Sequence, residues 1–304
     1  HLKQFEDIVN TVKPIVEKET QTVINVNYSF QKKSTDTIAV DLNNEPFRNE
    51  KGELVFRPGG HGALIQNLNE LEADIVFIKN IDNVAQSNQE KITVYKKALA
   101  GVLIELQQKI FFYLKAIDSG TFNQETLEEA ILFLREKLNI TGTSEIHNLS
   151  FEESVELVKT SLDRPIRICG MVKNEGEPGG GPFWTKSKSG KISLQIVESS
   201  EVDLLLNEQE TILKEASHFN PVDLVCGIRN FKNEKFDLMQ YVDQDRGFIV
   251  NKSVSGIDIK GYELPGLWNG AMANWLTVFV EVPLITFNPV KTVNDLLSQA
   301  HQPD

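Results

Sequence analysis

The sequence predicts an α/β protein with a mixed, mostly parallel sheet, and three observations support this fold class. Over residues 1–84, segments with helical periodicity alternate with strand-like runs, which is typical of mostly parallel sheets. Residues 86–164 change to helical periodicity throughout. Strand-like runs return after residue 165, separated by loops that contain Gly and Pro. We therefore expect one domain over residues 1–304, with a helical insertion at about 86–164.

The first third of the chain is predicted to alternate between helices and strands. Residues 74–79 are nearly continuous in apolar side chains, which is typical of a central strand covered on both faces. The chain starts with His1 and enters an amphipathic pattern almost at once, so we expect an N-terminal part of the fold to be missing. The predicted elements are a helix to about residue 19, strands at 22–30 and 37–41, a helix at 63–71 and a strand at 74–79.

The middle third is predicted to be helical, and the last third is predicted to complete the sheet. One long amphipathic stretch includes Leu99, Leu103 and Leu106. A later helix opens with Ser150 as its cap and Glu153 three residues on, the pattern of a capping box. The remaining predicted elements are helices at 127–138 and 151–162 and strands at 166–172, 192–198, 222–227 and 275–287.

Composition narrows the classes of partner. The formal net charge is −12 and no run of Lys or Arg stands out, so a polyanion would be repelled and we expect no nucleic-acid partner. Cys169 and Cys226 lie in separate apolar runs, and neither a disulfide framework nor a zinc spacing can be built from them. The longest apolar run contains Glu281 and Pro283 and is too short to span a bilayer. With no signal peptide, we expect a cytoplasmic protein with buried, reduced thiols and no membrane partner.

A glycine-rich loop at residues 57–63 is the first candidate site. Gly59, Gly60 and Gly62 let the backbone approach a ligand closely, and the helix that follows favours negative charge at its N-terminus. The same residues would also serve as a tight turn between a strand and a helix. His61 alone fits a structural histidine as well as a base or ligand.

The second candidate site follows the strand predicted at residues 74–79. Asp82 leaves the strand between Asn80 and Asn83, at the strand end where ligands bind in open α/β sheets. Mg²⁺ commonly takes one or two carboxylates from the protein and its other ligands from water and substrate phosphates. A turn in which the Asp side chain caps the strand end remains the alternative.

Three segments, in this order, resemble the eukaryotic-type UDP-sugar pyrophosphorylases. Residues 56–64 read Phe-Arg-Pro-Gly-Gly-His-Gly-Ala-Leu, residues 80–83 read Asn-Ile-Asp-Asn, and residues 287–297 contain Asn-Pro-Val-Lys and Asp-Leu-Leu. In those enzymes the first segment holds uracil, the second binds metal and nucleotide, and the lysine of the third reaches phosphate. Residues 31–40 and 176–184 resemble an uncharacterised bacterial family that carries a domain of unknown function and is distantly related to these enzymes.

The resemblance implies a GT-A-like nucleotidyltransferase core of three layers. In such enzymes sugar 1-phosphate attacks the α-phosphate of UTP, which releases pyrophosphate and leaves a UDP-sugar. On this interpretation Asp82 binds Mg²⁺ and Lys291 neutralises phosphate charge. The implied nucleotide site consists of Gly59, Gly60, His61, Gly62, Asn80 and Asn83.

Further candidates lie in the second half of the chain. Glu198 resembles the family carboxylate that meets sugar hydroxyls, although a surface strand end is an equal alternative. We expect Gly179 and Gly180 to belong to a lid over the sugar. Asn220 and Asp223 precede a buried strand and would complete the sugar and metal sites, or simply form a structural turn.

The function is therefore left with three alternatives. The first is a Mg²⁺-dependent nucleotidyltransferase that acts on UTP and a sugar 1-phosphate. The second is a nucleotide-sugar-binding or regulatory protein without turnover, since the family's glycine-rich basic motif that cradles phosphates is absent from this chain. The third is a structural protein in which each glycine-rich loop is only a turn.

Overall fold

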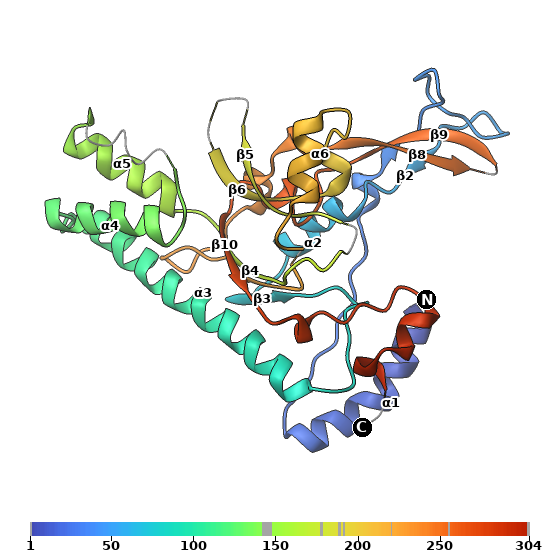
Figure 1. The fold of residues 1–304 in the computed structure, drawn as a ribbon, viewed down its shortest axis with the longest axis horizontal. Helices are drawn as coiled ribbons and strands as arrows, with labels where there is room; N and C mark the ends of the chain where they lie inside the picture. Colours follow the sequence, from blue (N-terminus) through green and yellow to red (C-terminus); the bar gives the residue numbers. More distant parts are fainter. Residues whose placement is uncertain are drawn as a thin grey trace.

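A four-stranded mixed sheet forms the centre of the computed structural model, which describes residues 2–141, 148–176, 179–187, 190, 192–219, 221–254 and 256–302 (Figure 1). The strand order is β10–β4–β7–β3. Strand β10 pairs with β4 in parallel, whereas β7 is antiparallel to both β4 and β3. The strands are β3 (Ile75–Ile78), β4 (Ile166–Met171), β7 (Asp223–Gly227) and β10 (Leu276–Glu281).

The prediction of a mixed sheet is confirmed, but the expected predominance of parallel pairings is wrong. Strands β3, β4 and β10 run in the same direction, while β7 runs against them between β4 and β3. The reason lies in the chain between β4 and β7, which leaves and re-enters the sheet at one edge. Lys173 forms a bridge with His218, and the Phe219 N–H donates to Val172 O at 2.9 Å. A strand that returns from the edge at which its predecessor ended must run antiparallel to it.

Three helices follow β3, as the periodicity predicts: α3 (Gln89–Asp118), α4 (Gln124–Glu136) and α5 (Phe151–Leu162). Helix α3 packs apolar side chains such as Leu99 and Leu103 against β4 and β7, and α4 and α5 lie near its C-terminal end (Figure 1). The predicted capping box of α5 is present, because Ser150 Oγ accepts from the Glu153 N–H and Glu153 Oε2 accepts from the Ser150 N–H. The capping box satisfies two backbone N–H groups that the helix itself cannot bond.

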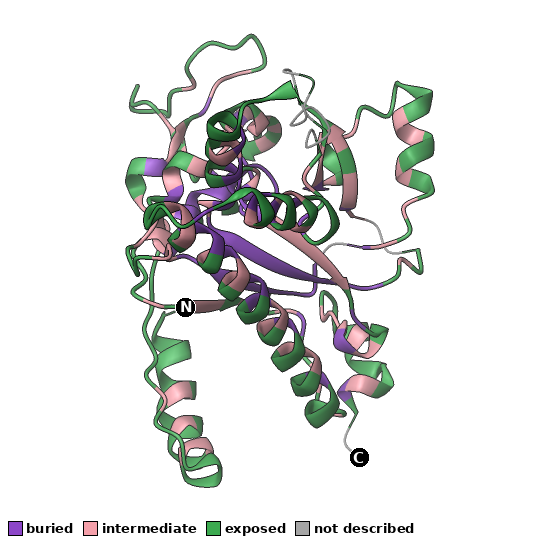
Figure 2. Ribbon diagram, turned by 90° about the vertical axis from the view of Figure 1, so that its left-hand side faces the viewer, coloured by how far each residue is buried: buried purple, intermediate pink, exposed green. Residues whose placement is uncertain are grey.

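The opposite face of the sheet is covered by the short helix α2 (Ile65–Asn69) and by residues 267–275. This second core contains Ile65, Leu68 and Trp268 together with both cysteines, which are buried and free. The prediction that both thiols are buried is therefore confirmed. Figure 2 shows the buried residues concentrated between these layers.

Three antiparallel strand pairs and several short helices complete the fold. The β8–β9 hairpin and strand β5 were not predicted from the sequence. The remaining strands are β1 (Thr37–Ile38), β2 (Phe56–Arg57), β5 (Gly181–Lys186), β6 (Ile192–Val197), β8 (Phe248–Val254) and β9 (Ile257–Glu263). The short helices include α6 (Asn207–Lys214), η1 (Lys33–Thr35), η2 (His61–Leu64), η4 (Ser199–Glu201), η5 (Leu238–Tyr241), η6 (Gln244–Arg246), η7 (Gly270–Met272), η8 (Leu284–Thr286), η9 (Val293–Leu297) and η10 (Gln299–His301).

The N-terminal region differs from the expectation in two respects. Helix α1 (Leu2–Thr20) forms as predicted, but it has no buried residue and stands apart from the core (Figure 2). Residues 22–30 were predicted as a strand, and this is wrong, because among the described residues no strand pairs with them. The segment at 74–79 forms β3, but it is an edge strand of the sheet and Phe77 is 54% exposed, so its predicted central position is also wrong. Within the described residues, none of the helices is long and apolar enough to cross a membrane.

The two core thiols should be chemically silent in the folded protein. Burial raises the pKa of Cys169 to about 11 and raises the pKa of Cys226 as well. At pH 8 the thiolate fraction of Cys169 is then roughly one in a thousand, and the thiolate is the reactive form. We expect a disulfide reagent such as DTNB to leave the native protein unmodified and to titrate both thiols after unfolding in urea. Rapid modification of the native protein at pH 8 would show that this core opens.

Candidate functional site

Most of the predicted site residues gather at one edge of the sheet. Because β3, β4 and β10 run in the same direction, their C-terminal ends meet at this edge, and β7 begins there. The edge therefore collects residues 79–84, 172–176 with 179–181, 218–219 with 221–223, and 282–291 from four separate parts of the chain. This is the edge at which ligands bind in open α/β sheets.

The second and third sequence motifs are joined directly at this edge. Asn83 forms an antiparallel bridge with Pro289, and the Val290 N–H donates to Asp82 O at 2.8 Å. Lys291 follows immediately and is exposed. Its backbone N–H donates to Asp295 Oδ2 at 2.8 Å, which fixes the turn. Asp82 and Lys291, which are far apart in the sequence, are thus held on paired backbone segments.

Asn83 organises this pairing through its side chain. Its Nδ2 donates to Thr286 O at 3.1 Å and to Val222 O at 3.4 Å, and its Oδ1 accepts from the Asn288 N–H at 2.7 Å. The residue is 4% exposed, so this amide is bonded within the protein. Asn80 lies exposed at the start of the same turn, where its carbonyl accepts from the Asn83 N–H. Contacts of Asn80 and Asn83 with a nucleotide stay predictions.

Asp223 is the first residue of β7, and two lysines surround its carboxylate. Oδ1 lies 3.7 Å from Lys79 Nζ and 4.0 Å from Lys96 Nζ. Burial raises the pKa of Asp223 and lowers that of Lys79, and in each case the opposite charge acts against the effect of burial. The sequence named Asp223 as a metal ligand, which stays a prediction, but the partners that the structure gives its carboxylate are ammonium groups.

The glycine-rich loop leads from β2 into η2 and packs against residues 263–269. Gly60 has φ of 81°, which glycine adopts at little cost. A Cβ at Gly62 would overlap the backbone oxygen of Pro265, and a Cβ at Gly59 would come within 2.6 Å of Thr35 O. Much of the space that these glycines leave open is therefore taken by the protein's own chain, as the turn interpretation requires.

His61 is exposed at the start of η2, and its ring has a defined orientation. Its Nδ1 accepts from the Leu267 N–H at 3.1 Å. The acceptor role of Nδ1 assigns the proton of the neutral ring to Nε2. The loop therefore presents an imidazole N–H donor.

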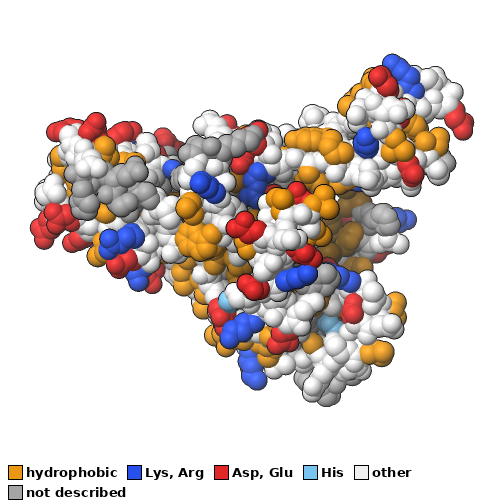
Figure 3. Space-filling model, turned by 45° about the horizontal axis from the view of Figure 1, so that its top comes forward, with side chains coloured by type: hydrophobic (Ala, Val, Ile, Leu, Met, Phe, Trp, Pro, Cys, Tyr) orange, Lys and Arg blue, Asp and Glu red, His pale blue; other side chains and the backbone are white. Residues whose placement is uncertain are grey.

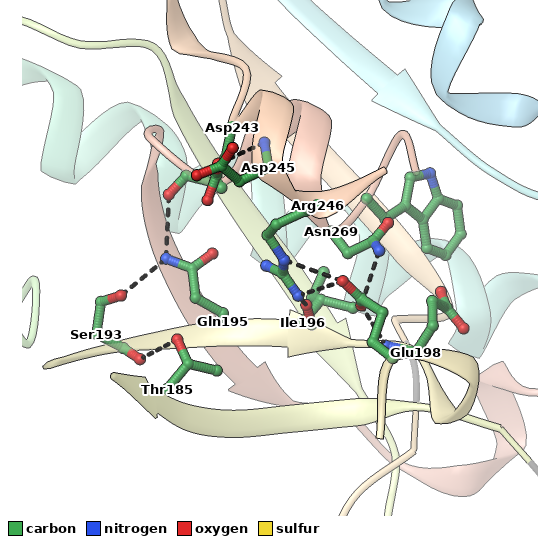
Figure 4. A network of polar contacts seen from close by, with 12 residues as sticks. Thr185, Ser193, Gln195, Ile196, Glu198, Asp243, Asp245, Arg246 and Asn269 are labelled. Carbon is green, nitrogen blue, oxygen red and sulfur yellow. Dashed lines mark hydrogen bonds and ion pairs between the residues drawn. The ribbon is translucent and has the colours of Figure 1, made fainter. Parts of the chain in front are cut away.

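A mostly buried carboxylate, Glu201, links this region to the candidate sugar site through Arg246, Asn269 and Glu198, which lie close together in Figure 4. It accepts from Arg246 Nε at 3.0 Å, from Asn269 Nδ2 at 2.8 Å and from the Glu198 N–H at 2.9 Å. Asn269 is completely buried, and the side chain of Glu201 is 12% exposed. We call Glu201, Arg246, Asn269 and Glu198 the Glu201 cluster. Only Glu198 among them was predicted from the sequence, because single polar residues in separate segments carry no recognisable pattern.

The predicted sugar-site residues from two loops lie together. A Cβ at Gly180 would come within 2.8 Å of Glu198 Cα, and one at Gly179 would come within 2.6 Å of the Phe219 ring. Glu198 is half-buried at the end of β6. Asn220 lies outside the described residues, as do residues 177 and 178 of the glycine-rich loop.

A charged group that was not predicted stands beside these loops. His218 Nε2 lies 3.1 Å from Glu281 Oε2 at the end of β10, and Lys173 Nζ lies 3.8 Å from Glu281 Oε1. The hydrogen bond with His218 is the main reason that the pKa of Glu281 is lowered. The sequence did offer one signal for this group, because Lys173 and His218 lie close to the ends of predicted strands.

A larger cavity lies elsewhere. Its volume is about 880 Å³, and it opens beneath the β5–β6 hairpin between residues such as Gln195, Arg246 and Trp275. Among the predicted site residues that the structure describes, none lines it. A smaller cavity of about 170 Å³ opens at the motif-bearing edge and includes Asn83. On the face seen in Figure 3, basic side chains are interspersed with acidic ones.

Comparison with known proteins places the chain in a family. The model of a family described as a domain of unknown function (DUF4301) matches residues 1–302, so the chain belongs to that family. No curated protein matches the chain.

Solved structures similar to the chain include UDP-sugar pyrophosphorylases. A variant of UDP-glucose pyrophosphorylase from Leishmania major has a TM-score of 0.50 and 15% identity, with 98% of this chain and 52% of that chain covered. Another variant of that enzyme, in complex with UDP-glucose, has a TM-score of 0.47 and 15% identity over 97% and 52% of the two chains. A proposed UDP-N-acetylglucosamine pyrophosphorylase from Entamoeba histolytica has a TM-score of 0.39 and 15% identity over 95% and 59%. The first of these likenesses shows a shared fold, and the chain spans about half the length of these Leishmania proteins.

Substitution of Gly62 by alanine tests the packing of the glycine-rich loop. The new Cβ would overlap backbone atoms of Pro265. Overpacking of this kind typically costs about 1–3 kcal/mol, and we expect such a loss in the free energy of unfolding, measured with urea. Gly101→Ala is the control, because Gly101 lies inside α3 with no atom within 4 Å of the new Cβ. It should gain about 0.5–1 kcal/mol. Equal stability of Gly62→Ala and wild type would mean that residues 264–266 do not rest on the loop.

Proposed function

We propose that this chain is the nucleotide-sugar-binding core of a GT-A-like nucleotidyltransferase, which forms a UDP-sugar and pyrophosphate from UTP and a sugar 1-phosphate. The observation that carries the proposal is the backbone pairing of residues 82–83 with residues 289–290, which brings Asp82 and Lys291 to one edge of the sheet. Such chemistry requires positioning and charge stabilisation rather than a protein nucleophile. We place it in the cytoplasm, where two reduced thiols are ordinary.

The base site of the proposal is the glycine-rich loop. The His61 ring accepts the Leu267 N–H through Nδ1, which leaves the Nε2–H as a donor on an exposed ring. A uracil carbonyl oxygen would accept from such a donor. Gly59, Gly60 and Gly62 keep the backbone of this loop close to residues 263–266, so His61 is held on a rigid support.

Asp82 is the proposed ligand of Mg²⁺. Among the described residues, no group of three or more His, Cys, Asp or Glu side chains could enclose a metal ion. One carboxylate fits Mg²⁺ nonetheless, because this ion commonly keeps waters and takes its remaining ligands from substrate phosphates. Bound there, the ion would neutralise phosphate charge. Lys291, which follows the residue bonded to the Asp82 backbone, would bind a phosphate oxygen.

Glu198 and the Gly179–Gly180 backbone are the proposed sugar site. Their loops touch, and the Glu198 backbone is fixed by Glu201. A carboxylate beside a glycine backbone offers acceptors for sugar hydroxyls and room for the ring to approach. Binding without turnover is the second candidate function, because the chain lacks the glycine-rich basic motif that cradles phosphates in the pyrophosphorylases it resembles.

A thermal-shift panel tests the nucleotide site. We expect UTP, UDP-glucose or UDP-N-acetylglucosamine, but not ATP or GTP, to stabilise the protein, and more strongly with Mg²⁺. A ligand at a hundred times its dissociation constant adds about 2.7 kcal/mol. Asp82→Asn should remove the Mg²⁺-dependent part of the shift, whereas Asp258→Asn, with the same charge change in the exposed hairpin strand β9, should keep it. A full Mg²⁺ effect in Asp82→Asn would remove Asp82 from the metal site.

Lys291→Ala separates phosphate binding from base binding. Loss of a hydrogen bond to a charged group costs about 1.5–3 kcal/mol, so the affinity for UTP should fall roughly ten- to a hundredfold. The affinity for uridine should not change, and isothermal titration calorimetry with both ligands measures the difference. Lys51→Ala, at an exposed position between β1 and β2, is the matched control. An equal loss for uridine would contradict the phosphate role.

A further inference from the structure

The cavity of about 170 Å³ at the motif-bearing edge has an unusual charge balance. Its lining includes Lys79, Asn83, Gln89 and Lys96, and none of the described residues that line it is acidic. Since a water molecule takes about 30 Å³ of the liquid, the cavity has room for several waters or for one small polyatomic ion. Lys79 and Lys96 thus bring two positive charges to a small, half-open cavity.

Asp223 only partly neutralises these two charges. It lies behind the cavity and pairs both ammonium groups through the same oxygen, Oδ1, at 3.7 and 4.0 Å. These separations are longer than the roughly 2.7–2.9 Å of a close charged hydrogen bond. The two ammonium groups carry six N–H donors, and one carboxylate cannot satisfy them all. The group of three side chains keeps a net positive charge.

The other polar groups of the cavity form its walls. The side chain of Asn83 is bonded to Val222, Thr286 and Asn288, and Gln89 Nε2 donates to Ala85 O. Gln89 is the first residue of α3, where the helix dipole also favours negative charge. An anion in the cavity would therefore meet the two ammonium groups and the N-terminus of this helix.

We propose that Lys79 and Lys96 form an anion subsite for a phosphate group, with Asp223 as the partial counter-charge with which the anion competes. The site needs neither a base nor a metal ion, so it stands independently of the proposed function. Its occupant is either a free phosphate ion or the terminal phosphate of a nucleotide.

Lys96→Gln tests the subsite against Lys97→Gln. Both variants lose one positive charge from the same helix, but Lys97 is exposed and does not line the cavity. With inorganic phosphate as the probe, titrated by calorimetry at constant ionic strength, Lys96→Gln should lose about tenfold in affinity because it loses a charged hydrogen bond. Lys97→Gln should bind as the wild type does. Equal phosphate affinities of the wild type and both variants would overturn the proposal. Failure of the wild type to bind either free phosphate or UTP would overturn it as well.

Asp223→Asn gives a test of opposite sign. It removes the competing carboxylate and keeps the side chain's size, so phosphate affinity should rise, provided that circular dichroism shows a folded protein. A fall in phosphate affinity in folded Asp223→Asn would overturn the competing role of the carboxylate. Lys96→Gln keeps the subsite testable if the asparagine variant does not fold.

Pyrophosphate and UTP distinguish the two sources of the phosphate group. A tenfold loss in Lys96→Gln for phosphate and pyrophosphate, with UTP unchanged, identifies a site for the free ion. A loss that extends to UTP but not to uridine identifies the terminal phosphate of a nucleotide. If the wild type binds phosphate but does not prefer uridine nucleotides to ATP and GTP, the proposed function is refuted and the phosphate subsite is not.

Discussion

The pairing of the mostly buried Glu201 carboxylate is the interaction on which the arrangement of the site depends. A buried charge is tolerated only when it is paired and hydrogen-bonded, and Glu201 meets this condition through Arg246, Asn269 and the Glu198 N–H. Asn269 follows the segment that supports His61, and Glu198 lies against Gly180. The hydrogen bonds to this one carboxylate therefore fix the segment that supports His61 relative to the loop that contains Glu198.

The direction of β7 is the second constraint on the site. Because the chain between β4 and β7 leaves and re-enters at one edge, the first residue of β7, Asp223, faces the turn that follows the last residue of β3. Its carboxylate then meets Lys79 of that turn and Lys96 of the helix packed on the same face. With a parallel β7, Asp223 would lie at the opposite edge. The mixed sheet thus creates the cluster of charges that a parallel sheet would separate.

Local sequence patterns predicted much of the fold, whereas the pairing between distant segments could not be predicted from them. The helical periodicity of α3, the Ser150 capping box and the apolar runs of β4 and β7 each depend on neighbours in the sequence, and each was predicted. Residues 22–30 have strand-like composition, but a strand also requires a partner, and none pairs with them among the described residues. The β8–β9 hairpin was missed because exposed positions hold Ile249 and Ile257 while half-buried positions hold lysines, so that its apolar alternation is weak.

The same division holds for the candidate site. Asp82 and Lys291 were found because each lies in a contiguous motif, whereas Lys79, Lys96 and Glu201 gain their significance only from contacts across the fold. Glycine is ambiguous for a different physical reason, since it permits close approach without specifying by what. At Gly62 the approaching group is the Pro265 backbone, so that side of the loop is closed to a ligand. In the proposed function, a nucleotide base would therefore reach the loop from the exposed side of His61, where the imidazole N–H donor lies.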